Sequence, residues 1–284
     1  MKHWKIQLAA LLLLFAGTVR GDVMLLVHGY LSNVFVWQQS GVAPVLQQFG
    51  WRPAAVLLGA PQGLIPVPLQ GAQADDKLVF LQLDTRAPLV TQSNVVIAAL
   101  RWIQDRYPDE DIILVGHSLG GLVGRLALVR GGARQVKALI TIASPHLGTG
   151  LAYEGLEATD DPWFLRMMKE FFIGKEYRVV RQSRWMLRDI LPPLPGRLLY
   201  WLNTRRHPDV AYYSIVRTSI NGMLGDPVVP GFSQDMANVP AIGSRSKRVI
   251  EGFSHFLSLL DGYTLVNIVD ELRRKEKQGA KPRR

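Results

Sequence analysis

The segment Ile112-Ile113-Leu114-Val115-Gly116-His117-Ser118-Leu119-Gly120-Gly121 joins an apolar run to a serine flanked by glycines. Apolar residues then recur at helical spacing, at Leu122, Val123, Leu126 and Val129. The pattern predicts a buried strand, a strained turn that exposes the Ser118 side chain at the carboxyl edge of a sheet, and a helix. Glycines at 116 and 120 suit such a turn, because a Cβ there would strike neighbouring backbone. The alternative is a Gly-Ser loop that only caps an ordinary helix.

The rest of the chain alternates between strand and helix patterns. Apolar runs predict strands at Val23–Val27, Ala54–Leu58, Ala138–Ala143, Ala211–Val216 and Lys247–Ile250. Amphipathic spacing predicts helices at Pro44–Phe49, Asn94–Tyr107 and Phe256–Leu272. This alternation is typical of an α/β fold with a mostly parallel central sheet and helices on both faces. We expect its core to comprise residues 22–148 and 211–272.

Two segments depart from this pattern. Residues 149–210 mix apolar bulk with arginines and lysines, and their place between two strands predicts a helical cap or lid over Ser118. An ordinary amphipathic helix pair packed on the sheet is the alternative. The basic tail, residues 273–284, is expected to be disordered.

The amino terminus resembles an export signal. Lys2 and Lys5 precede an apolar run from Ile6 to Ala16 that is short for a membrane span, and cleavage after Gly21 would start the mature chain at Asp22. An uncleaved amino-terminal anchor and a buried first helix are the alternatives. We therefore expect a periplasmic or secreted protein. A chain without cysteine suits a bacterial export route better than a eukaryotic one.

Net charge and cysteine content limit the binding partners and metal sites that are compatible with the chain. The 284 residues carry a formal net charge of +10, which fits an anionic membrane surface, nucleic acid or simple solubility. No aromatic stacking motif or recognition-helix pattern supports nucleic acid. Without cysteine there is neither a disulfide nor a thiolate metal site, and the six histidines lack metal-ligand spacing. The sequence predicts no metal and no cofactor.

A serine hydroxyl becomes nucleophilic when a neutral imidazole accepts its proton and a carboxylate fixes that imidazole's tautomer. In a fold of this kind the two partners follow the serine, with the carboxylate first and the histidine last. Only His255 is both late and on a loop after a strand, although it could instead be a polar helix cap. Asp226, in a Gly-Pro-rich turn after the 211–216 strand, is the preferred carboxylate over Asp235 and Asp209. A purely local turn role is its alternative.

Acyl transfer also needs two amides to stabilise the oxyanion. The amide of Leu119, at the start of the helix after the serine, is one candidate. The amide of Tyr30, in the loop after the first strand, is the other. His28-Gly29 in that loop could alternatively be a tight turn with no catalytic part.

With His28-Gly29-Tyr30, Gly116-His117-Ser118-Leu119-Gly120-Gly121, Ser144-Pro145-His146-Leu147-Gly148-Thr149 and Asp226/His255 in this order, the chain resembles an α/β-hydrolase of the lipase and carboxylesterase group. The two middle segments are similar to bacterial triacylglycerol lipases and to the PGAP1-like deacylases. The resemblance spans roughly Val23 to Leu272 and implies ester hydrolysis through an acyl-enzyme. The calcium site and disulfide of some bacterial lipases are not carried over.

These features favour a serine hydrolase of carboxylic esters, with an apolar or lipidic substrate and an anionic membrane surface as a further partner. An acyltransferase or thioesterase that uses the same acyl-enzyme is the second hypothesis. A catalytically silent module that binds a membrane surface is the third. The basic insertion and tail motivate it, and the intact candidates at every catalytic position oppose it.

Overall fold

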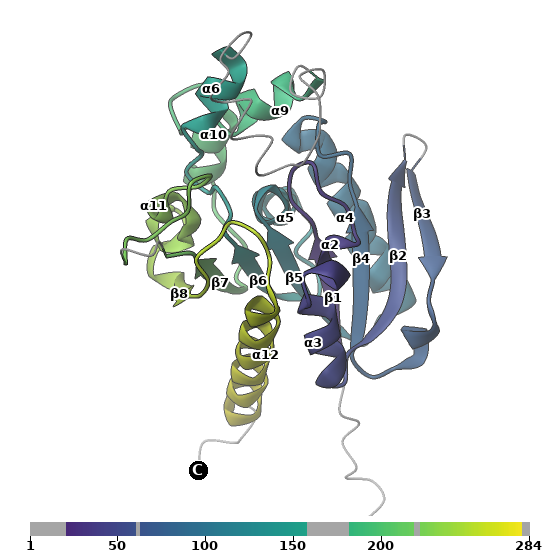
Figure 1. Cartoon of the computed structure of the whole chain (residues 1–284). Helices are drawn as coiled ribbons and strands as arrows, with labels where there is room; N and C mark the ends of the chain where they lie inside the picture. Colours follow the sequence, from purple (N-terminus) through teal and green to yellow (C-terminus); the bar gives the residue numbers. More distant parts are fainter. Residues whose placement is uncertain (1–20, 61–62, 158–181, 219–221, 280–284) are drawn as a thin grey trace, which may run out of the picture.

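An eight-stranded sheet forms the centre of the protein, as seen in a computed structural model that describes residues 21–60, 63–157, 182–218 and 222–279 (Figure 1). The strand order is β3-β2-β4-β1-β5-β6-β7-β8. All neighbouring pairs are parallel except β2 and β3. The carboxyl ends of the parallel strands therefore meet at one edge of the sheet, where loops from distant parts of the sequence come together.

The strands include all six that the sequence predicts. Those are β1 (Asp22–Val27), β2 (Arg52–Ala60), β6 (Val136–Ile142), β7 (Ala211–Val216) and β8 (Ser246–Ile250), and the strand before the serine is β5 (Asp111–His117). Two further strands, β3 (Gly63–Pro68) and β4 (Lys77–Gln82), were not predicted. The prolines at 66 and 68 argue against a strand in the sequence, which is why β3 was not predicted. The structure tolerates them because β3 lies at the edge of the sheet.

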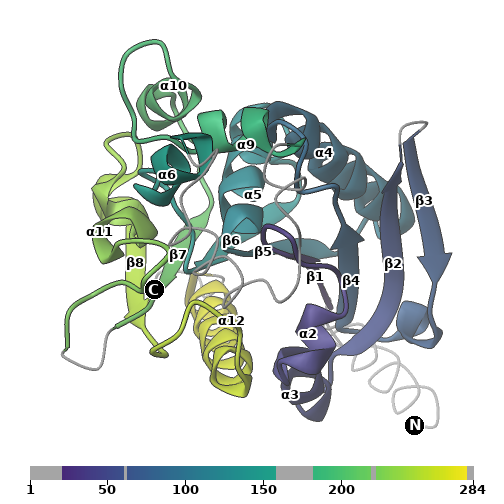
Figure 2. The same cartoon turned by 45° about the horizontal axis from the view of Figure 1, so that its top comes forward.

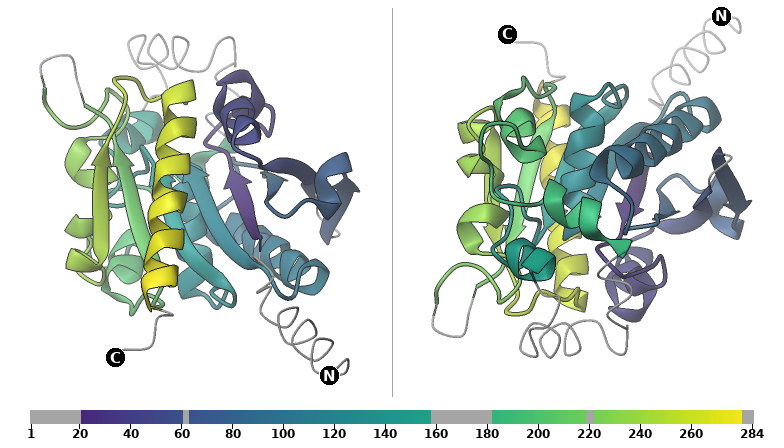
Figure 3. Two further views of the ribbon diagram at one scale, coloured as in Figure 1. Left: turned by 90° about the horizontal axis from the view of Figure 1, so that it is seen from below. Right: turned by 90° about the horizontal axis from the view of Figure 1, so that it is seen from above.

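Helices cover both faces of the sheet. On one face lie α4 (Leu89–Arg106) and α5 (Leu119–Val129), and on the other α2 (Val36–Gln39), α3 (Val42–Gln48) and α12 (Leu259–Gly279) (Figure 3). In β1, Val23, Leu25 and Val27 pack toward the first layer, whereas Met24 and Leu26 pack toward the second. The alternation explains why a strand in this position is apolar throughout.

Three helices of the predicted cap are described, namely α6 (Leu151–Glu157), α9 (Arg184–Asp189) and α10 (Leu198–Thr204). They lie beyond the carboxyl edge of the sheet, on the side where α5 begins (Figure 2). Residues 158–181, which include the apolar stretch on which part of the cap prediction rests, lie outside the described residues. The short helix α11 (Gly231–Gln234) follows β7.

The prediction of a disordered tail from residue 273 is wrong for its first seven residues, because α12 continues to Gly279. Arg273 donates to Asp22 at 2.7 Å and also pairs with Asp76, while Lys275 pairs with Glu271 at 2.8 Å. The two Arg273 pairs tie the basic end of α12 to the start of β1 and to the residue before β4, whereas the Lys275 pair lies within α12. The composition of this segment therefore reflects a solvated helix end rather than an unfolded one.

The predicted export signal occupies the first 21 residues of the chain. Residues 1–20 lie outside the described residues. Within the described ranges, no helix has the length and apolar content needed to cross a bilayer.

Candidate active site

Ser118 lies at the sharp turn between β5 and α5. Its backbone has φ of 51° and ψ of −123°, a conformation that non-glycine residues seldom adopt and that functional sites often retain. A Cβ on Gly116 would lie 2.3 Å from Gly121 Cα, and one on Gly120 would lie 2.4 Å from the Val27 carbonyl oxygen. The two glycines therefore permit the close packing of α5 against β1 and β5 that this turn requires.

Ser118, His255 and Asp226 form a continuous hydrogen-bonded chain. His255 Nε2 lies 2.9 Å from Ser118 Oγ, and His255 Nδ1 lies 3.0 Å from Asp226 Oδ2. A carboxylate can only accept, so Nδ1–H donates to Asp226 and Nε2 is left to accept the serine proton. The three residues predicted from the sequence are thus brought together, although 108 and 29 positions separate them along the chain.

The Asp226 carboxylate is fixed by four donors. Oδ1 accepts from the amides of Val228 and Val229, both at 2.8 Å, and Oδ2 accepts from Gln234 Nε2 at 2.9 Å as well as from His255. Burial alone would raise the pKa of Asp226, but the hydrogen bonds from His255 and the two amides outweigh it and hold the pKa below its usual value. The carboxylate is therefore ionised at neutral pH.

His117, the residue before the serine, also contacts His255. His117 Nε2–H donates to the His255 carbonyl oxygen at 2.8 Å, and the two ring centroids are 5.4 Å apart. Burial, together with the nearby His255, lowers the pKa of His117 to about 3. His117 is thus a neutral donor at neutral pH and adds no charge beside the site.

The other described histidines lie in structural positions. His28 Nε2 accepts from the Leu83 amide at 3.1 Å, and His146 Nε2 lies 3.0 Å from Thr141 Oγ1. His207 bonds the Arg205 carbonyl. Of the rival aspartates, Asp235 caps a short helix through the Ala237 amide, and Asp209 is exposed.

The two predicted oxyanion donors flank the serine. Leu119 opens α5, whose first amides have no acceptor within the helix. Gly29, next to Tyr30, lies so close that a Cβ on it would be 3.0 Å from Ser118 Cβ. The Tyr30 hydroxyl donates to Ser183 Oγ at 2.7 Å, which connects this loop to the cap. The use of the two amides as oxyanion donors stays a prediction.

A cavity of about 420 Å³ opens onto Ser118 and His255. Its wall is partly apolar, through Leu31, Val36, Phe256 and Leu257, and partly polar, through Ser32, Asn33, Gln39 and Ser40. This volume is within the range of small-ligand sites, which measure about 300–1,000 Å³.

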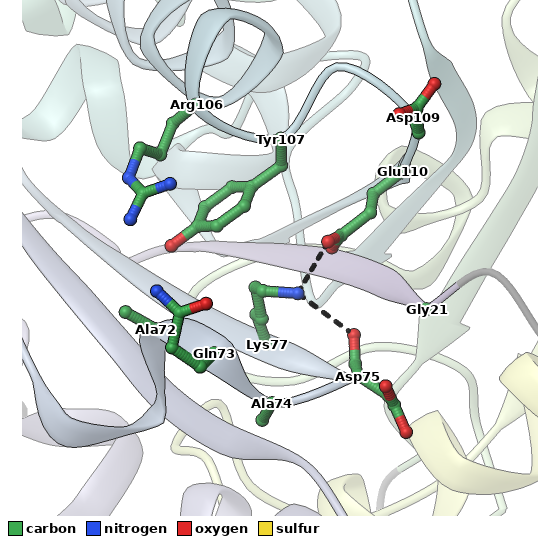
Figure 4. A pocket seen from close by; sticks show the side chains of 10 residues that line it. All are labelled: Gly21, Ala72, Gln73, Ala74, Asp75, Lys77, Arg106, Tyr107, Asp109 and Glu110. Carbon is green, nitrogen blue, oxygen red and sulfur yellow. Dashed lines mark hydrogen bonds and ion pairs between the residues drawn. The ribbon is translucent and has the colours of Figure 1, made fainter.

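A second cavity, of about 440 Å³, lies at the opposite edge of the sheet, where β1, β4 and β5 begin (Figure 4). Its wall contains the ion pair between Lys77 and Glu110, at 2.6 Å, with the ring of Tyr107 beside Lys77. Ser118 lies at the carboxyl edge instead, so this cavity has no part in the site around the serine. In the described part of the chain, no group of three or more His, Asp and Glu side chains could hold a metal ion.

The residues that support Ser118, His255 and Asp226 are not predicted by the sequence. Gln234 follows no recognisable motif, although it lies only eight positions from the Asp226 carboxylate to which it donates. His117 could have been noticed, since it lies beside the serine, but its contact with His255 spans 138 positions.

Comparison with known proteins agrees with this architecture. Residues 80–166 match the model of the PGAP1-like alpha/beta domain. No curated protein matches the chain in sequence.

Solved structures share the fold at low identity. A lipase of Bacillus licheniformis, BlEst2 in its mature form, is 17% identical with a TM-score of 0.56, over 89% of this chain and 92% of that one. A lipase-esterase related protein of Clostridium acetobutylicum is 12% identical with a TM-score of 0.57, over 89% and 95%. The RedJ thioesterase of Streptomyces coelicolor is 15% identical with a TM-score of 0.52, over 84% of each chain.

The chain has the α/β-hydrolase fold, as its sequence predicts. Within that fold, the segment that carries β5, the serine turn and β6 is similar to the PGAP1-like alpha/beta domain.

Proposed function

We propose that the protein is a serine hydrolase that cleaves carboxylic esters through an acyl-enzyme. The observation that carries this proposal is the hydrogen-bonded chain from Ser118 Oγ through the His255 ring to the buried Asp226 carboxylate. The strained serine turn at the mouth of a cavity supports it. These are the parts that acyl transfer requires.

In the first half of the reaction, Ser118 Oγ attacks the ester carbonyl carbon while its proton passes to His255 Nε2. Asp226 stabilises the imidazolium that forms, and the Leu119 and Tyr30 amides donate to the oxyanion. The C–O bond to the alcohol then breaks, and the alcohol leaves with the proton from Nε2. Ser118 is left acylated.

In the second half, a water molecule gives its proton to His255 Nε2 and attacks the acyl carbon. The bond to Ser118 Oγ breaks, the serine recovers its proton from Nε2, and the carboxylic acid departs. Because His255 transfers a proton in both halves, a change that displaces its ring slows both.

We propose an apolar, lipidic acyl group for the substrate. Leu31, Val36 and Leu257 give one part of the cavity an apolar wall, and the partly exposed ring of Phe256 also lines the cavity. Apolar contact with an acyl chain contributes roughly 0.8 kcal/mol for each buried methylene. The rate should therefore rise with acyl length until the cavity is filled.

A rate series on p-nitrophenyl esters, from acetate to long acyl chains, tests both statements. Ser118→Ala is expected to lower kcat about 10⁶-fold without unfolding the chain. Ser246→Ala, at the start of β8, is the matched control and should keep the activity of the unaltered protein. Undiminished hydrolysis by Ser118→Ala would refute the enzyme proposal. A rate that falls from acetate onward would refute the lipidic substrate alone.

We also propose that the cap rests on an anionic lipid surface. Within the described part of the cap, residues 182–206 contain five arginines and one acidic residue, Asp189, whereas α6 contains Glu154 and Glu157. Two of those arginines lie over tryptophan rings, Arg188 at 5.3 Å from Trp185 and Arg205 at 5.2 Å from Trp201. Tryptophan favours the membrane interface, and arginine binds phosphate groups.

Export remains part of the proposal. Asp22 is the first residue of β1, so cleavage after Gly21 would leave every described strand intact. Amino-terminal sequencing of the protein recovered from the periplasm or medium would test it, with Asp22 as the expected first residue.

A further inference from the structure

Arg217, the residue directly after β7, is buried. Its side chain is 1% exposed and forms a two-point ion pair with Asp261 of α12, which is fully buried. Arg217 Nη1 lies 2.6 Å from Asp261 Oδ1, and Nη2 lies 3.0 Å from Oδ2. The cost of desolvating a buried ion pair offsets most of its electrostatic gain, so the pair contributes little net stability. Stability alone therefore does not explain why the pair is present.

The guanidinium also holds the loop that carries His255, at both ends of that loop. Arg217 Nη1 donates to the Glu251 carbonyl oxygen at 2.8 Å, and Nη2 donates to the Phe256 carbonyl oxygen at 3.1 Å. Between them, Gly252 has φ of +79°, and a Cβ there would lie 2.8 Å from Nη1. The loop is thus wrapped closely around the guanidinium.

The backbone of Arg217 supports the other partner of the serine. Its amide donates to Gln234 Oε1 at 2.8 Å, and Gln234 Nε2 in turn donates to Asp226 Oδ2 at 2.9 Å. The Arg217 carbonyl oxygen accepts from the amide of Gly225, the residue before Asp226, at 2.7 Å. One residue therefore connects the Asp226 turn with the His255 loop.

We propose that Arg217, oriented by Asp261, is a positioning residue that fixes the His255 ring and the Asp226 carboxylate relative to Ser118. This inference rests on the ester hydrolysis proposed above. The Arg217 guanidinium supports the loop that carries His255, and the Arg217 backbone supports the turn that carries Asp226. The same residue therefore fixes the geometry of both hydrogen bonds of His255, to Ser118 and to Asp226. A displacement of about 1 Å in such a site can cost roughly 10²-fold in rate.

The test compares Arg217→Lys with Arg273→Lys. Arg273 lies at the other end of α12 and also donates to carboxylates, Asp22 and Asp76, so it is a matched control for the loss of an arginine pair. A lysine at position 217 keeps the positive charge, but it cannot make the four hydrogen bonds that Arg217 Nη1 and Nη2 donate to Glu251, Phe256 and Asp261. Two readouts are used: kcat and KM on a p-nitrophenyl ester well below each unfolding midpoint, and the far-downfield proton resonance of His255 Nδ1–H.

For Arg217→Lys we expect kcat to fall about 10²-fold with KM changed less than about twofold, and the downfield resonance to be lost or displaced. Arg273→Lys should retain the kcat, the KM and the resonance of the unaltered protein. If Arg217→Lys keeps either kcat or the resonance, or if Arg273→Lys loses both to the same degree, the proposal is overturned.

Asp261→Asn serves if Arg217→Lys does not fold, because it keeps one acceptor oxygen for the guanidinium. It should show the same pattern with a smaller fall in kcat, about tenfold, and an unchanged kcat or resonance would likewise overturn the proposal. The two proposals fail separately. If the unaltered protein does not hydrolyse esters, ester hydrolysis fails, and the resonance alone decides whether Arg217 positions His255.

Discussion

Asp226 remains ionised although its side chain is fully buried, because its four donors outweigh the cost of burial. Ionised Asp226 fixes the proton on His255 Nδ1 and so leaves Nε2 free to accept. The arrangement is sensitive to the nature of the group at position 226, since a neutral amide could donate where the carboxylate accepts.

Asp226→Asn is therefore expected to lower kcat about 10⁴-fold, because an amide that donates to Nδ1 places the imidazole proton on Nε2. Steady-state kinetics on a p-nitrophenyl ester measure the effect. Asp235→Asn is the control: this neighbouring aspartate is also buried, but it caps a helix and does not contact His255. A retained kcat in Asp226→Asn would assign the orienting part to another group.

His117 illustrates how a residue beside the serine affects stability. Its pKa is about 3 in the folded protein, against an ordinary 6.5. Between these values the unfolded chain binds a proton that the folded protein does not, so this contribution to stability is present above pH 6.5 and is lost as the pH falls toward 3. The slope from one such group reaches about 1.4 kcal/mol per pH unit.

His117→Gln should flatten the dependence of unfolding free energy on pH between about 3 and 6.5. The glutamine amide keeps an N–H for the His255 carbonyl, so ester hydrolysis at pH 8 should change little. Urea unfolding at a series of pH values gives the slope. An unchanged slope would show that His117 is not held neutral by burial.

Among the elements, the cap is attached to the rest of the protein by hydrogen bonds on its inner side. Its inner side is joined to the helices α4 and α5: Asp189 accepts from the amide of Leu89, the first residue of α4, at 2.8 Å, and Asn203 accepts from the buried Arg125 of α5 at 2.6 Å. Its outer side presents Trp185, with 63% of its surface exposed, above Arg188. These contacts are compatible with the proposal that the cap binds an anionic lipid surface.

The double substitution Trp185→Ser/Arg188→Ser should weaken binding to vesicles that contain phosphatidylglycerol. We expect about a tenfold loss, since a basic residue near an anionic surface is worth about 1 kcal/mol and tryptophan adds interfacial affinity. Co-sedimentation measures it, with phosphatidylcholine vesicles for comparison. Phe49→Ser/Arg101→Ser, which also removes one exposed ring and one exposed arginine, is the control. Equal losses in the two proteins would contradict the cap as the docking surface.

At the scale of the whole molecule, the sequence predicts the elements that are strongly apolar. The central strands on either side of β5 stand out because both of their faces are buried, and the serine turn stands out because its glycines are required by contact. Chain order, together with the place of each residue in a loop or turn after a strand, then favours Asp226 and His255 as the partners of Ser118. The fold class follows from these few segments.

What the sequence does not predict depends on contacts between distant segments. The edge strand β3 contains two prolines, and the last turns of α12 are basic and low in complexity, so local pattern argues against both. Ion pairs of Arg273 with Asp22 and Asp76 order those turns, and they join residues about 200 or more positions apart. The supporting contacts of Arg217 are not predicted by the sequence for the same reason.

Labelling with a fluorophosphonate, followed by peptide mapping, tests the nucleophile most directly. A single adduct on Ser118 is predicted, absent in Ser118→Ala and formed far more slowly in His255→Ala, because the hydroxyl needs the imidazole to accept its proton. An adduct on a different serine, or an unaltered protein that is not labelled, would contradict the assignment of Ser118 as the activated nucleophile.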